Sequence, residues 1–177
     1  MDASPPIAVT VIGTDRPGIV AAVTKALYEA GCNLEDVTST ILRGHFSMVM
    51  VVRGPEGVGA ARLEEALAPA ARALDLVVAA RLVEEVTAAP EESTHIVSVY
   101  GADHPGIVFR VADALARSGA NVTDLTSRVI GSPDEPVYAL MLEISSASPD
   151  EVAAALEGLR AEVGVEVSVH PIERDVL

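Results

Sequence analysis

Apolar positions along the chain recur at the spacing of strands in some segments and at the spacing of helices in others. The same order of segments occurs twice. Residues 7–13 form a short β-branched run ending at glycine, which is typical of a strand. Over residues 19–30 the apolar positions recur at helical spacing, and Gly31 favours a stop there. Two further strands are expected over residues 33–43 and 46–53, joined by a tight reversal.

The remainder of this first unit predicts one more helix and one more strand. The helix is expected over residues 58–68, with Pro69 kinking or ending it, and the strand over residues 74–86. Met48 and Met50 lie two apart on the third strand, so they should face the same side, in the core. The Val and Met content of that strand predicts a central position, buried on both faces.

The second half of the chain repeats the first. Residues 7–42 align without gaps onto residues 95–130, with 16 identities in 36 positions. In this copy the reversal before the third strand is expected to be longer, over residues 131–136. Residues 148–151, Ser-Pro-Asp-Glu, predict a capping box with proline at the first helical position. Gly164 then precedes a last strand ending near residue 172.

Both copies therefore have the order β-α-β-β-α-β, which is the ferredoxin-like order of the α+β class. Each is expected to form an antiparallel four-stranded sheet with both helices on one face. The predicted domains cover residues 7–86 and 95–173, joined by a linker at 87–94 and flanked by tails at 1–6 and 174–177. The uncovered sheet faces favour pairing of the two units and a homodimer.

Charge and composition exclude several classes of function. The formal net charge is −14, from 12 basic and 26 acidic residues, so the surface would repel nucleic acid and anionic membranes. RNA binding on such a sheet also needs surface aromatics, which make up 3% of the chain. No apolar run reaches the length of a membrane span, and the N-terminus does not resemble a secretory signal. We therefore expect a cytoplasmic protein.

Cysteine and histidine offer little chemistry. The single cysteine, Cys32, excludes an internal disulfide and is expected to be a small buried residue. The four histidines have no close metal-ligand spacing. We see no Ser/His/Asp or Cys/His order and no glycine-rich loop of the nucleotide type, so neither an enzyme nor a cofactor is expected.

The candidate site is the turn that leads from the first strand of each unit into the first helix. The first N–H groups of that helix have no internal partner and carry the positive end of the dipole, which suits a carboxylate. Pro17 suits the first helical position, and Gly18 permits close approach of a ligand. Asn33, expected near this turn, offers both an acceptor and a donor, and Asp15 could hold an ammonium group. The candidate ligand-binding residues are Asp15, Arg16, Pro17, Gly18, Ile19 and Asn33 in the first unit, and Asp103, His104, Pro105, Gly106, Ile107 and Asn121 in the second.

The residues of this turn resemble those of ACT domains. The motif Asp-Arg-Pro-Gly-Ile-Val with a downstream Gly-x-Asn-x-x-Asp occurs in the first unit, and Asp-His-Pro-Gly-Ile-Val with the same sequel in the second. The resemblance covers residues 7–86 and 95–173 and implies amino-acid binding at a domain interface, through this turn and the start of the second strand. Because Arg16 is replaced by His104 in the second copy, the two sites need not be equivalent.

Two such domains in one chain are similar to the glycine cleavage system transcriptional repressor group. That similarity implies a regulatory protein that acts through a protein partner, such as a transcription regulator or an enzyme, in amino-acid or glycine metabolism. The alternative is a ligand-independent interaction scaffold. In that case Asp15 and Asp103 cap a helix, and Asn33 and Asn121 satisfy a turn, as such residues commonly do.

Overall fold

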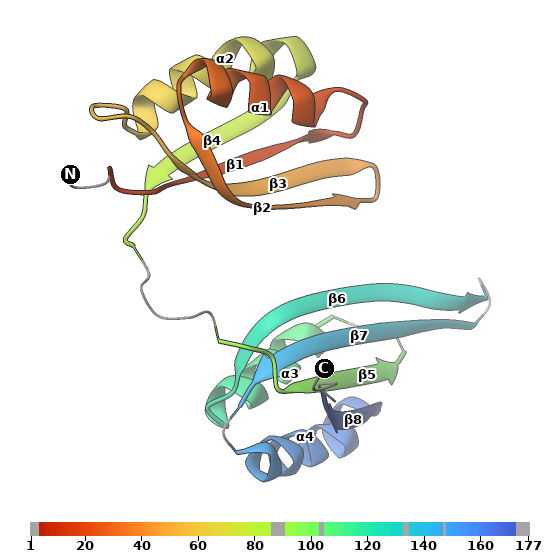
Figure 1. Cartoon of the computed structure of the whole chain (residues 1–177). Helices are drawn as coiled ribbons and strands as arrows, with labels where there is room; N and C mark the ends of the chain where they lie inside the picture. Colours follow the sequence, from red (N-terminus) through yellow and green to blue (C-terminus); the bar gives the residue numbers. More distant parts are fainter. Residues whose placement is uncertain (1–3, 86–90, 103–104, 133–134, 147, 173–177) are drawn as a thin grey trace, which may run out of the picture. The chain divides into compact units, whose positions relative to one another are not determined.

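The computed structural model describes residues 4–85, 91–102, 105–132, 135–146 and 148–172, with the main chain alone at 161–163. The chain divides into two compact units, residues 1–88 and 89–177, each with the predicted α+β, ferredoxin-like order (Figure 1). Most of the expected linker and tails lies outside the described residues, so their boundaries stay predictions.

In the first domain a four-stranded antiparallel sheet has the strand order β2-β3-β1-β4. Both helices lie on one face of this sheet (Figure 1). The elements are β1 (Ile7–Thr14), α1 (Ile19–Glu29), β2 (Asn33–Leu42), β3 (His45–Arg53), α2 (Ala60–Leu74) and β4 (Leu76–Leu82).

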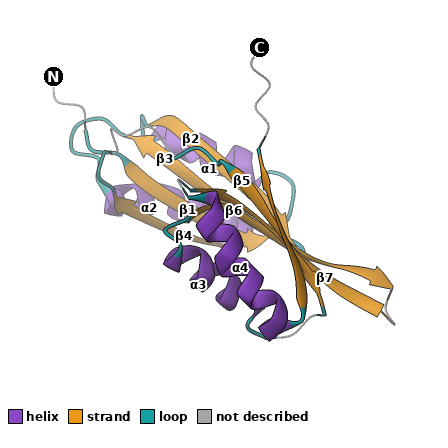
Figure 2. Ribbon diagram, turned by 90° about the horizontal axis from the view of Figure 1, so that it is seen from below, coloured by secondary structure: helices purple, strands orange, loops and turns teal. Residues whose placement is uncertain are grey.

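The second domain repeats this arrangement with the strand order β6-β7-β5-β8. Its hairpin of β6 and β7 is longer than its counterpart and projects beyond α3 and α4 (Figure 2). The elements are β5 (His95–Gly101), α3 (Ile107–Arg117), β6 (Asn121–Ser132), β7 (Glu135–Ser145), α4 (Pro149–Val163) and β8 (Val165–Pro171).

Each domain has its own aliphatic core between sheet and helices. Met48 and Met50 are each 1% exposed within the first core, which confirms that they share the inward side of β3. Burial on both faces of β3 was wrong: the strand lies between β1 and β2, but its residues alternate, and Val49 is 43% exposed. The helices cover one face only, so the other face of the sheet is open.

Several boundaries in the first domain differ from the predictions, and the last strand, expected over residues 74–86, covers only Leu76–Leu82. Helix α1 begins at Ile19, beyond Pro17, because Gly18 takes the N-cap position with a φ of +95°. Helix α2 includes Pro69 and continues to Leu74. It continues because Ala71 and Leu74, one and two turns after Leu67, still pack on the core, and this packing outweighs the hydrogen bond that a proline cannot donate.

Two details of the second domain also differ. Ser148 is the N-cap of α4 and Pro149 its first residue, as predicted, but no side chain caps the helix, so the capping box is not formed. The reversal before β7 is shorter than expected, because Gly131 pairs with Pro136 and Ser132 with Glu135. Gly164 ends α4 with a φ of +67°, in agreement with the sequence pattern.

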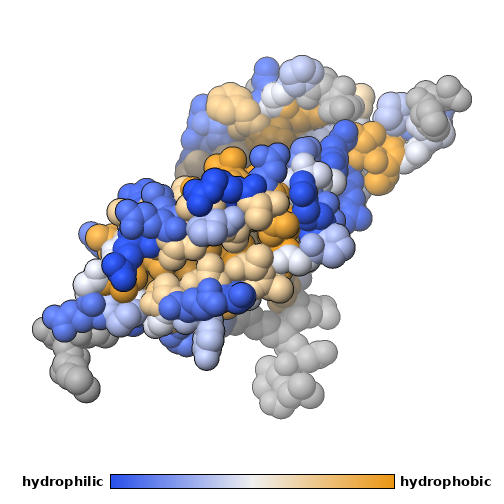
Figure 3. Space-filling model, turned by 90° about the horizontal axis from the view of Figure 1, so that it is seen from above, coloured by the Kyte–Doolittle hydropathy of each residue, from blue (hydrophilic) through white to orange (hydrophobic). Residues whose placement is uncertain are grey.

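The outward sides of α1 and α2 are of mixed character. Figure 3 shows a continuous pale-orange to orange area in the middle of this face, with hydrophilic residues around it. Exposed apolar side chains of α1 include Val20 (48%) and Tyr28 (81%).

Candidate ligand-binding site

The turn between β1 and α1 holds its shape through the main chain. The amide of Asp15 donates to the carbonyl of Gly44 (2.9 Å), and the amide of Ala22 donates to the carbonyl of Gly18 (2.9 Å). No side chain caps α1, so Asp15 is not a helix cap. The first amides of the helix, at 19–21, are therefore not satisfied by a side-chain cap and are available at its positive end.

Gly18 combines an unusual backbone with open space. Its φ of +95° lies in the left-handed region, and a Cβ built there would meet nothing within 4 Å. Asp15, Arg16 and Pro17 are all exposed around it. The turn thus offers unobstructed main-chain donors and one carboxylate on a nearby side chain.

The second domain has the same backbone arrangement at the start of α3. Gly106 caps the helix with a φ of +99°, the amide of Arg110 donates to its carbonyl (3.0 Å), and no side chain caps the helix. Pro105 is exposed beside it. Asp103 and His104, which were also predicted for this site, lie outside the described residues.

Ile19 and Ile107 point away from the turns. Each side chain is 2% exposed and belongs to the core of its domain. Of these two predicted residues, only the main-chain amide could reach a ligand. Their burial anchors the first turn of each helix, so the open amides keep a fixed direction.

Asn33 lies at the opposite end of the sheet from the turn, and the expectation that the two would be close is wrong. Strands β1 and β2 are both antiparallel to β3, so they run parallel and begin at the same end. Helix α1 returns the chain to the end where β1 began, and β2 starts there. The seven residue steps from Ile7 to Thr14 separate the start of β2 from the turn by roughly 24 Å. Asn121 has the same relation to the turn before α3.

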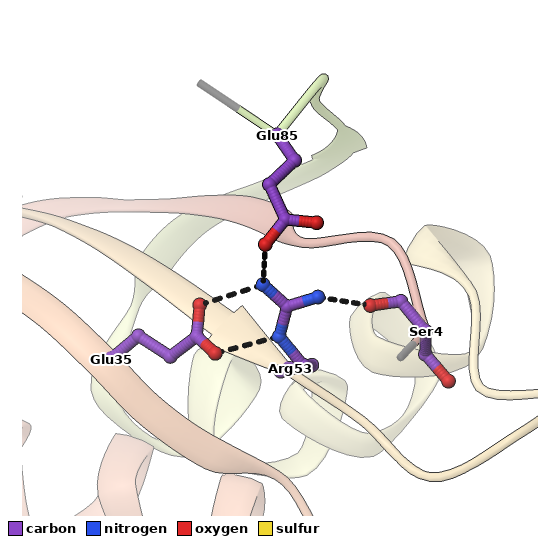
Figure 4. A network of polar contacts seen from close by, with 4 residues as sticks. All are labelled: Ser4, Glu35, Arg53 and Glu85. Carbon is purple, nitrogen blue, oxygen red and sulfur yellow. Dashed lines mark hydrogen bonds and ion pairs between the residues drawn. The ribbon is translucent and has the colours of Figure 1, made fainter. Parts of the chain in front are cut away.

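A charged cluster occupies the Asn33 end of the first sheet (Figure 4). Arg53, which pairs with Asn33 across the strands, donates from Nε to Glu35 (2.6 Å) and from Nη2 to Glu85 (3.1 Å). Its Nη1 donates to the carbonyl of Ser4 (2.6 Å). The hydrogen bond with Glu35, together with the two carboxylate charges, raises the pKa of Arg53 above its ordinary value. The cluster joins the N-terminal segment, β2 and the chain after β4.

Hydroxyl groups replace this cluster in the second domain. The Nδ2 of Asn121 donates to the Oε2 of Glu91 (3.0 Å), so the amide of one predicted site residue already contacts a carboxylate of its own chain. Ser93 and Thr123 share a hydrogen bond of 2.8 Å, and the hydroxyl of Thr94 accepts from the amide of Ser146 (3.1 Å). The end of the first sheet at Asn33 and the end of the second sheet at Asn121 therefore differ chemically.

Sequence reasoning missed Arg53 and its partners. Residues 4, 35, 53 and 85 are far apart in sequence, and Glu35 lies at a register shift between Leu34 and Asp36. The spacing of apolar residues in the sequence does not reveal a bulge of this kind. The one available sign was an arginine directly after the apolar residues of β3.

Replacing Arg53 by glutamine is expected to loosen this end of the first domain. Glu35 and Glu85 would lose a shared cation, so the backbone amides of Ser4 and of residues 83–85 should exchange hydrogen several-fold faster. Mass-spectrometric exchange measures this directly. Arg81→Gln, on the exposed side of β4, is the matched control and should leave these rates unchanged. Equal rates in both variants would show that the cluster does not order the segment.

Other chemistry is sparse in the described residues. Cys32 is half-buried, and desolvation raises the pKa of its thiol, so the reactive thiolate is disfavoured. Within the described part of the chain no three His, Cys, Asp or Glu side chains are grouped as a metal site. Among the helices described there, none is long and apolar enough to cross a membrane.

Comparison with known families identifies the family to which the chain belongs. Residues 6–81 and residues 95–161 each match a model of the ACT domain. This chain is a tandem ACT-domain protein. The two matches include both candidate turns and all strands of the two sheets except β8 and the last residue of β4, so the resemblance stated from the Asp-x-Pro-Gly motifs is confirmed.

Relatives of the tandem ACT protein include a regulator and an enzyme. The glycine cleavage system transcriptional repressor of Escherichia coli is 29% identical over 150 residues, which is 84% of this chain and 78% of the repressor. The phosphoserine phosphatase SerB2 of Mycobacterium tuberculosis is 28% identical over 173 residues, 96% of this chain and 41% of the phosphatase. The UPF0237 protein MK1213 of Methanopyrus kandleri is 48% identical over 67 residues, 37% of this chain and 74% of that protein.

Solved structures share the fold across nearly the whole chain. A protein of unknown function from Galdieria sulphuraria superposes with a TM-score of 0.76 at 26% identity, covering 96% of this chain and 99% of the other. A protein assigned as a glycine cleavage system transcriptional repressor gives 0.73 at 20% identity, covering 96% and 98%. At that identity the second match speaks for the fold alone.

Proposed function

We propose that the tandem ACT protein is a regulatory protein that binds a small amino acid and acts through association with a protein partner. The observation that supports this most is the turn at Gly18, where uncapped helix amides face open space beside an exposed carboxylate. Amides at a helix start suit the ligand's carboxylate, and Asp15 suits its ammonium group. Similarity to the E. coli repressor supports a role in glycine or amino-acid metabolism at the level of transcription.

The position of Asn33 shapes this proposal. Because the turn and the asparagine lie at opposite ends of one sheet, a ligand held by both must contact more than one ACT domain. A homo-oligomer would supply the additional domains. A cytoplasmic location and a non-enzymatic role belong to the same proposal, and the strongly negative charge supports action through a protein rather than directly on nucleic acid.

Calorimetric titration with a panel of amino acids tests the proposal. We expect at least one small amino acid to bind, and Gly18→Val to weaken binding at least tenfold by filling the space at the turn. Gly57→Val is the matched control, because Gly57 also has a positive φ (+84°) and open surroundings but lies in another loop. Gly106→Val, with Gly119→Val as its control, tests the second turn in the same way.

Asn33→Ala and Asn121→Ala test the asparagines separately. Binding that uses the turn of one domain and the asparagine of another should weaken in at least one of these variants, and it should depend on protein concentration where the two domains belong to different chains. The absence of heat and of thermal shift across the panel at millimolar ligand would contradict the proposal. The ligand-independent scaffold would then be the better description.

A further inference from the structure

The helical face of the first domain carries a hollow of about 800 Å³ between the end of α1 and the start of α2. It lies on the side of the domain that Figure 3 shows, where an apolar area is surrounded by hydrophilic residues. Most of the apolar residues that line the hollow are half-buried, and the charged ones are exposed. The apolar residues are Ala26, Ala30, Pro55, Val58 and Ala66, and the charged residues are Glu29, Glu56, Arg62 and Glu65.

The helical face of the second domain has a hollow of about 670 Å³ between α3 and α4, with charge of the opposite sign. Arg110, Arg117 and Asp113 line it and sum to +1, whereas three glutamates and one arginine give the first hollow −2. Phe109, 70% exposed, lines the same hollow. In a chain with a net charge of −14, a positive surface of this kind is the exception.

The repeat shows that the two faces differ at equivalent positions in a complementary way. Helices α1 and α3 align at an offset of 88, so Phe109 stands where the first domain has Ala21, and Arg117 stands where it has Glu29. The second face therefore adds an aromatic ring and a positive charge where the first has a small side chain and a negative charge. Aromatic and arginine side chains are the ones that contribute most to binding when they enter a pocket of a partner.

The chain between the domains starts and ends on the open faces of the two sheets, away from the helices. Arg53 lies on the outward side of β3 and donates to Glu85 (3.1 Å). Asn121 pairs with the outward-facing end of β7 and donates to Glu91 (3.0 Å). Both ends of the connecting segment are thereby held on the sheet side opposite to the helical hollows.

This segment is too short for the two hollows to meet within one chain. Such a contact would place two helical layers between the two sheets, which separates the sheets by roughly 30 Å. The six residue steps from Glu85 to Glu91 span at most about 22 Å. The surface that complements each hollow must therefore belong to another copy of the chain.

We propose that the protein self-associates through its helical faces, with the α3–α4 face of one copy on the α1–α2 face of another. Phe109 enters the apolar hollow of the first domain, and Arg110 and Arg117 face its carboxylates. Two copies that exchange this contact make it twice, which closes a dimer. The contact needs no amino-acid ligand, so it does not rest on the proposed function.

Sedimentation of the full chain without ligand, over micromolar to submillimolar concentrations, tests this surface. We expect a concentration-dependent dimer that weakens with added salt. Phe109→Glu should weaken the association about tenfold or more, because it removes the ring and adds a carboxylate next to others. Val77→Glu is the matched control, since Val77 is an apolar residue of similar exposure (71%) on the open face of the first sheet, and it should leave the association unchanged.

Charge reversal tests the pairing of the two faces. Arg117→Glu and Glu29→Arg each introduce the residue that the other domain has at the equivalent position. Both side chains are exposed, so both variants should fold. Each should weaken the association about fivefold, and the chain that carries both changes should regain most of the lost affinity. A variant that merely destabilises its own domain would not be rescued in this way.

Several results would overturn the assignment. A monomer at every concentration, or unchanged association in Phe109→Glu, would show that the helical faces do not meet. An equal loss in Val77→Glu would assign the contact to the open sheet faces, and failure of the double variant to recover would show that these charges do not face each other. Absence of amino-acid binding would contradict the proposed function alone, and amino-acid binding by a strict monomer would contradict this contact alone.

Discussion

Replacing Leu142 by alanine should lower the free energy of unfolding of the second domain by about 3–4 kcal/mol and leave that of the first domain unchanged. Leu142 is fully buried at the centre of β7, and alanine would leave a cavity that the surrounding aliphatic side chains can only partly fill. The two cores share no residue, so the cavity affects one of them.

Urea denaturation followed by hydrogen exchange of peptides from each domain separates the two transitions. Leu125→Ala is the matched control, because Leu125 faces Leu142 across the strands but is 44% exposed, and it should cost less than about 1 kcal/mol. A parallel loss of stability in both domains would contradict this prediction and show that they unfold as one unit.

Gly131→Val should destabilise the second domain by about 3 kcal/mol through the β6–β7 hairpin. Gly131 has a φ of +93°, which a β-branched residue rarely adopts, and a Cβ there would lie 2.5 Å from the carbonyl oxygen of Glu135. That oxygen belongs to the backbone of the paired strand and cannot move aside cheaply. Strain and steric clash therefore act together at this position.

The first domain supplies the control for this prediction. Gly44, in the corresponding reversal, has a φ of +81°, but a Cβ there would meet nothing within 4 Å. Gly44→Val should therefore show the backbone strain alone, about 1–2 kcal/mol. Denaturation of each domain measures the difference. If both valine variants cost the same, the contact with Glu135 contributes nothing.

Much of the fold followed from the pattern of residues. The repeat, the strand and helix order and the inward side of β3 depend on periodicity, which is local information and was present in the chain. The errors occurred where tertiary packing overrode a local rule. Pro69 did not end α2, because the apolar positions that follow it still had a core to pack on. Ser148 did not form the expected side-chain cap.

The candidate site could be predicted only in part. The glycines with positive φ at the two turns were identified from their motifs, because the residues of a turn are contiguous. The separation of Asn33 from the turn was already implied by the predicted β-α-β order, because a helix that follows a strand carries the chain back to the end where that strand began. Arg53 was missed for a different reason, since its partners come together only after the sheet has formed.

The parallel course of β1 and β2 gives each domain two chemically different poles, with helix amides at one and an asparagine at the other. A ligand that needs both poles is bound by two domains at once, and where those domains belong to different chains its affinity and the self-association of the protein are thermodynamically linked. More protein then means tighter apparent binding, and more ligand means more assembly. In that case the protein would respond to its own abundance as well as to the metabolite.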